Sequence, residues 1–165
     1  MKKICIALAS VFIILNLAWA GYYFLFWHSF QKCVGLNKND HTYSKGTQDE
    51  NYIVYVTDLS YLSLGKNLAV TRVHVGTGER SLDDGVYCNL TIWPRIMKED
   101  EYGISLIEYK EGNVVDEHVY RFMVNKDHEI IEDVPQECME YYNANKDQID
   151  HVFQLAEETW GDMLD

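Results

Sequence analysis

An uncharged run from Ile4 to Trp27 limits what this chain can fold into more than any other feature. At about 1.5 Å per residue, a helix over this run would be roughly 36 Å long. The hydrocarbon core of a bilayer is ~30 Å thick, so such a helix would cross it. The run has no charged face with which a helix packed on a soluble protein would meet water. We therefore predict a transmembrane helix within residues 1–30, through which the protein contacts the membrane.

A cleaved signal peptide over residues 1–20 is the competing interpretation of the same run. Lys2 and Lys3 precede the apolar run, and Ala18-Trp19-Ala20 has the small-x-small pattern that signal peptidase recognises. Cleavage after Ala20 would give a secreted protein. The apolar residues nevertheless continue from Gly21 to Trp27, and the rings of Tyr22, Tyr23 and Trp27 suit the headgroup boundary. An uncleaved signal anchor is the favoured interpretation.

The charges that flank the run predict its orientation. Lys2, Lys3 and the amino terminus outweigh Lys32 and Lys38 on the other side. Positive flanking charge is retained in the cytoplasm, so we expect a single-pass protein with a cytoplasmic N-terminus and its C-terminal domain outside.

The part of the chain that follows the anchor is strongly acidic. All 26 acidic residues lie beyond Lys32, and the whole chain has a net charge of −12. Such a charge repels the phosphates of nucleic acid, which we exclude as a partner, and it favours either solubility or a basic protein partner. Residues 31–50 are polar and without periodicity, which predicts a linker or a loosely paired first segment. Residues 51–165 then form one extracytoplasmic domain.

Residues 51–131 contain a series of strand signals. Asn51–Leu64 and Asn67–Val75 are rich in β-branched and aromatic residues and flank Gly65-Lys66, which predicts a hairpin with a two-residue turn. In Val86–Trp93 the residues alternate, and Val86, Cys88, Leu90 and Ile92 form the expected core face. Three further strands are expected at Tyr102–Lys110, Val114–Val124 and His128–Ile131.

The C-terminal residues change to helical periodicity. Asp133, Pro135 and Gln136 form a helix start, with the aspartate as the N-cap and the proline in the first turn. Apolar residues then recur at threes and fours, and Asn143 or Asn145 is a candidate break. The whole pattern predicts an α+β fold: an N-terminal transmembrane helix, then an antiparallel β-meander or partly closed barrel of five to six strands, with a C-terminal amphipathic helix packed on it.

Four cysteines are present, at positions 5, 33, 88 and 138. The predicted sheet and helix bring Cys88 and Cys138 into one layer, so this pair is the candidate disulfide in an oxidising compartment. The alternative is that both are small buried apolar residues.

No motif predicts a metal, a cofactor or a catalytic residue. The histidines lack the spacing of a zinc site, and the residues from Asn125 to Glu129 resemble only the start of a calcium loop. The best case for catalysis combines His74, Asp83, Asp84 and His118, whose imidazoles and carboxylates could divide the roles of acid and base.

The final helix offers the clearest patterned surface of the chain. Its acidic face consists of Glu140, Asp147, Asp150, Glu157 and Glu158. We take the acidic face as a candidate binding surface, and its alternative role is solvation. The leading hypothesis is a non-catalytic, membrane-anchored domain that binds or scaffolds another protein. The alternatives are a cell-surface hydrolase that uses histidine and carboxylates, and an acidic inhibitor or immunity-type protein that binds a basic partner.

Overall fold

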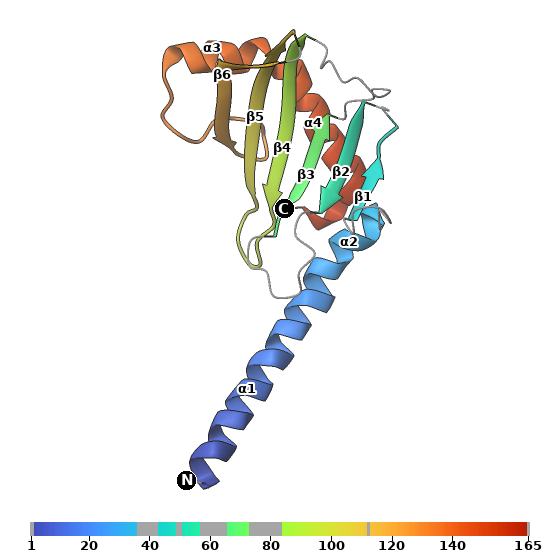
Figure 1. Ribbon diagram of the computed structural model, residues 1–165, viewed down its shortest axis with the longest axis vertical. Helices are drawn as coiled ribbons and strands as arrows, with labels where there is room; N and C mark the ends of the chain where they lie inside the picture. Colours follow the sequence, from blue (N-terminus) through green and yellow to red (C-terminus); the bar gives the residue numbers. More distant parts are fainter. Residues whose placement is uncertain are drawn as a thin grey trace.

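A computed structural model describes residues 2–35, 43–48, 51–56, 66–72, 84–111 and 113–164 of the chain. It has an α+β fold with a long apolar N-terminal helix, a six-stranded antiparallel sheet and C-terminal helices (Figure 1). The long helix projects away from one end of the sheet, and the C-terminal helix α4 lies across one sheet face.

The sheet is a meander in which each strand pairs with the next one along the chain. The strands are β1 (Tyr43–Gly46), β2 (Tyr52–Val56), β3 (Leu68–Arg72), β4 (Gly85–Trp93), β5 (Glu101–Lys110) and β6 (Asn113–Val124). The predicted meander is therefore confirmed. The partly closed barrel is wrong, since β1 and β6 form the two edges and do not pair with each other within the described residues.

Three strand predictions need correction. Val56 pairs with Leu68, a register that a two-residue turn at Gly65-Lys66 would not give; residues 57–65 lie outside the described residues. The segment expected at His128–Ile131 forms a turn and a single bridge, from Ile130 to Val124. Residues 31–50 were expected to form a linker or a loosely paired first segment. The second alternative holds for Tyr43–Gly46, which forms strand β1 on the edge of the sheet.

Strand β4 shows why local alternation predicts a half-buried strand well. Cys88, Leu90 and Ile92 are fully buried, as expected for the core face, and Val86 at the strand's start is half-buried. Their neighbours on the other face are half-buried, apart from Tyr87, whose ring is buried beneath Arg72 at 4.6 Å. The core lies between this strand face and α4.

Two helices follow the sheet, α3 (Gln136–Ala144) and α4 (Lys146–Trp160), with a short 3-10 turn, η2 (Gly161–Met163), at the end. The break falls at Asn145, one of the two expected positions, where φ is −111° and ψ is 18°. The predicted cap is wrong by two residues: Pro135 itself is the N-cap of α3. Helix α4 buries one stripe against β2, β3 and β4, formed by Ile149, Val152, Phe153, Ala156 and Trp160.

The N-terminal helix is continuous through three segments, α1 (Lys2–Tyr22), a π-helical turn η1 (Tyr23–Trp27) and α2 (His28–Val34). Its length and apolar composition are sufficient to cross a membrane. From Ile4 to Leu17 its large apolar side chains are exposed, whereas Trp27, Phe30 and Val34 belong to the core of the domain. Trp27 is 1% exposed, so its ring is covered by the domain, and the expected place of this ring at the headgroup boundary stays a prediction.

Candidate functional site

The residues expected to form a catalytic centre are not brought together by the described part of the chain. His74 and Asp83 lie outside the described residues, and His118 lies in β6 without a described side chain. The Asp84 carboxylate accepts a hydrogen bond of 2.6 Å from the backbone N–H of Glu111. Asp84 therefore connects the start of β4 to the turn between β5 and β6.

The predicted acidic face is divided by the break between α3 and α4. Glu140 lies on α3, where it accepts a hydrogen bond from Gln136. The other four acids lie on α4 and are exposed. Asp150 and Glu157 border one cavity, whereas Glu158 borders a second cavity beside β1, together with Lys45. The five carboxylates thus face several directions.

The cavity beside Asp150 and Glu157 has a volume of about 470 Å³ and lies between α4 and the turn after β6. Its apolar lining comes from Ile92, Tyr102, Phe153, Ala156 and Leu164. Its polar lining consists of Lys126, Asp127, His128, Asp150, Gln154 and Glu157. Sequence reasoning found Asp150 and Glu157 but missed the cavity that they share.

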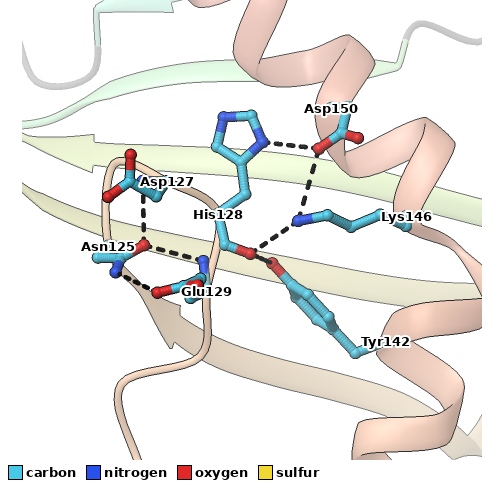
Figure 2. Close-up of polar contacts among 7 residues, drawn as sticks. All are labelled: Asn125, Asp127, His128, Glu129, Tyr142, Lys146 and Asp150. Carbon is cyan, nitrogen blue, oxygen red and sulfur yellow. Dashed lines mark hydrogen bonds and ion pairs between the residues drawn. The ribbon is translucent and has the colours of Figure 1, made fainter.

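The turn after β6 holds His128 opposite Asp150 (Figure 2), and both residues line this cavity. The side-chain oxygen of Asn125 accepts hydrogen bonds from the backbone N–H groups of Asp127 (3.0 Å) and Glu129 (2.9 Å). This closes a tight turn in which His128 has a positive φ of 60°, rare for a residue with a side chain. Because the Asn125 oxygen bonds the backbone, it is not presented to a cation as a calcium loop would require.

His128 is held from three sides. Its Nδ1 lies 2.6 Å from an Asp150 carboxylate oxygen, and its ring stacks on Phe153 with 3.8 Å between ring centroids. Its backbone carbonyl accepts hydrogen bonds from the Tyr142 hydroxyl (3.0 Å) and the Lys146 ammonium (2.8 Å), as Figure 2 shows. The imidazole is therefore fixed between a carboxylate and an aromatic face.

Lys146 also lies 3.6 Å from Asp150, so that carboxylate is shared between a lysine and the histidine. Burial, and then the nearby Cys88 and Asp150, raise the pKa of Tyr142 well above its ordinary value. The Tyr142 hydroxyl therefore remains a neutral donor to the His128 carbonyl through the physiological pH range.

The cysteines are free thiols in the structure. Cys88 is buried in the core, and Cys138 is a partly buried residue packed against the same core, as the expected layer arrangement requires. A bridge between them remains a prediction. Among the described residues, no group of three or more His, Cys, Asp or Glu side chains is placed to hold a metal ion.

Comparison with known proteins returned no match: no family model, no curated protein and no solved structure resembles the chain significantly. The functional argument therefore depends on the cavity, its charges and the long apolar helix.

Proposed function

We propose that the protein is a single-pass, membrane-anchored domain that binds a basic protein partner outside the cytoplasm, without catalysis. The binding site in this proposal is the cavity between α4 and the Asn125–Glu129 turn, which receives a lysine or arginine side chain of the partner. The observation behind it is the combination of an aromatic wall, formed by Tyr102 and Phe153, with three carboxylates around the same cavity.

The chemistry of that cavity fits a long basic side chain. Arginine and lysine combine an apolar stem with a cationic head. The stem would lie along the apolar wall, while the head would reach a carboxylate. Asp150 already bonds His128 and Lys146, so Asp127 and Glu157 are the carboxylates that would receive the head. Lys126 at the same rim adds one opposing charge, which favours a single cationic group over a dense basic cluster.

Two neighbouring glutamates provide a sharp test of this proposal. Glu157 borders the cavity, whereas Glu158 borders the other cavity beside β1, and both are exposed. The substitutions Glu157→Gln and Glu158→Gln change the net charge equally. A short glycine- and serine-rich peptide that contains one arginine would be titrated into the full chain in detergent by calorimetry. A hydrogen bond to a charged group contributes about 1.5–3 kcal/mol, so Glu157→Gln should weaken binding about tenfold or more.

Glu158→Gln should change the same dissociation constant less than about twofold, since an exposed charge away from the site contributes little. If both substitutions weaken binding equally, the peptide senses only the overall charge of the protein and the proposed site is wrong.

Membrane anchorage and orientation are part of the proposal. The exposed apolar helix from Ile4 onward supports anchorage, and the basic flank at Lys2 and Lys3 supports a cytoplasmic N-terminus. Protease added to intact cells should degrade the C-terminal domain. Full protection of that domain, with degradation after the cells are opened, would reverse the orientation.

A hydrolase is the second candidate because His128 and Asp150 form a pair at 2.6 Å beside the cavity. A carboxylate on Nδ1 would leave Nε2 to act as a general base toward water. A panel of nitrophenyl esters and phosphates would test this. Turnover that disappears with His128→Gln and persists with His28→Gln would favour the hydrolase over the binding domain.

A further inference from the structure

The connection between β4 and β5, residues 94–100, presents two large apolar side chains to the surroundings at its tip. Met97 is 97% exposed and Ile96 is 50% exposed. The tip is held in shape from behind, because the buried Asp100 carboxylate accepts a 2.7 Å hydrogen bond from the backbone N–H of Arg95. Both side chains are thus displayed by a closed turn.

This connection lies beside the point where the long helix leaves the domain. Arg95 in this connection is near enough to Tyr22, the last residue of α1, for the two residues to interact electrostatically. Figure 1 shows the β4–β5 connection at the end of the sheet from which α1 projects. A membrane crossed by the helix would therefore lie on the same side as Ile96 and Met97.

The length of the helix sets the level of the membrane. About 20 helical residues cross the hydrocarbon core, so a span that begins at Ile4 reaches the outer edge of the core near Tyr23. Phe24 and Leu25, 60% and 84% exposed, follow at that edge. The β4–β5 connection lies at the end of the sheet from which α1 projects (Figure 1), so we place it at this edge of the membrane.

We infer that Ile96 and Met97 insert into the outer headgroup layer of the membrane that the helix crosses. The inference rests on the membrane anchor of the proposed function. The occupant of this surface is a phospholipid bilayer. The insertion gives the domain a second contact with the membrane, beside the helix, and so fixes the tilt of the sheet. Two apolar side chains supply the contact, as in other interfacial anchors.

The charges around the tip make the contact depend little on lipid charge. Arg95 is paired with Glu101 at 2.6 Å. Lys98 is exposed, but so is its neighbour Glu99. The basic and acidic groups therefore offset one another, and the tip should contact neutral phosphatidylcholine as readily as anionic phosphatidylglycerol.

The methionines of the chain allow a direct measurement. The full chain, labelled with ¹³C at the methionine methyl groups, would be placed in phosphatidylcholine nanodiscs that contain a lipid with a spin label near the headgroup. Met97 and Met139 are both exposed, but Met139 lies in α3, at the opposite end of the sheet (Figure 1). The substitution Met97→Leu would assign the signal of interest.

We expect the spin label to remove the Met97 methyl signal and to leave that of Met139. Chemical reduction of the label should restore the Met97 signal, and Ile96→Asp should also restore it by keeping the tip out of the lipid. Equal intensities for Met97 and Met139 beside the active label would overturn the inference. So would a loss of signal that requires phosphatidylglycerol.

The anchor is tested separately in the same preparation. Elution of the chain apart from the nanodiscs would overturn the membrane anchor and, with it, the loop contact. Elution with the nanodiscs together with an unaffected Met97 would overturn the loop contact alone.

Discussion

The substitution Phe30→Ala tests whether the long helix belongs to the folded domain as well as to the membrane. Phe30 is 2% exposed and lies in the core cluster. Its ring packs against Phe26 and Trp27 with centroids 5.4 Å and 5.6 Å away. The Trp160 indole N–H lies 3.4 Å from the Phe30 carbonyl oxygen, which joins the end of α4 to α2.

The expected loss follows from the size of the ring that is removed. Replacing a buried phenylalanine by alanine lowers the free energy of unfolding by about 3–5 kcal/mol. The folded state loses the transfer free energy of the ring and also contains a residual cavity. The upper half of that range applies if the cavity between α2 and α4 does not collapse. A domain of this size has about 5–15 kcal/mol of stability in total, so one substitution in the helix would remove a large share.

The matched control is Phe24→Ala, a phenylalanine six residues earlier in the same helix that is 60% exposed. We expect this change to cost less than about 0.5 kcal/mol of domain stability. Urea unfolding of the full chain in a mild detergent, followed by tryptophan fluorescence, would measure both variants. Equal midpoints for Phe30→Ala and Phe24→Ala would refute the packing of the helix on the domain.

Three further changes probe the core and the cavity. Burial raises the pKa of the Cys88 thiol to about 12. At pH values above the ordinary pKa of a cysteine, the unfolded chain loses this proton while the folded chain keeps it, so the free energy of unfolding should fall by about 1 kcal/mol between pH 9 and pH 10; in Cys88→Ala, urea titrations should show a shallower fall. Gly103→Ala would place a methyl group 2.9 Å from the Trp93 ring and should lower the free energy of unfolding by about 1–3 kcal/mol. In a chain that already carries Trp93→Ala, the same glycine substitution should cause no such loss. Tyr142→Phe removes one of the two hydrogen bonds to the His128 carbonyl and should lower the free energy of unfolding by about 0.5–1.5 kcal/mol in the same assay. Loss of the whole turn would show instead that Lys146 cannot hold the carbonyl alone.

The sequence predicts those parts of the fold that depend on neighbours in the chain. The alternation in β4 identified its buried face because burial of one sheet face imposes a period of two on the sequence itself. Most of the meander could be predicted for the same reason, as each strand pairs with the next; the exceptions are β1, expected only as a linker or a loosely paired segment, and His128–Ile131, where a turn and one bridge replace the expected strand. Strand β1 gave a weaker signal, since Tyr-Ser-Lys-Gly lies on an edge, where its outer side has no strand partner among the described residues.

The candidate site was less predictable because its partners are distant in the chain. His128 and Asp150 are 22 residues apart, and their contact depends on the break at Asn145 and on the turn that Asn125 closes. Each of those features could be guessed separately, but the distance between the two side chains follows only from how α4 lies on the sheet. The acidic residues of α4 were visible in the sequence, whereas their separation into two cavities was not.

The helix itself illustrates why an apolar sequence does not identify its surroundings. Lipid and protein core select the same side chains, so Phe24 and Phe30 look alike in the sequence although one is exposed and the other buried. This bears on the predicted cleavage site at Ala20, which lies within a continuous helix. Cleavage there would leave Phe24 and Leu25 exposed to water on a released domain, while an intact helix keeps them beside lipid. We therefore expect a peptide that spans Ala20 and Gly21 in digests of the membrane fraction; a mature chain that begins at Gly21 would show instead that α2 folds onto a secreted domain.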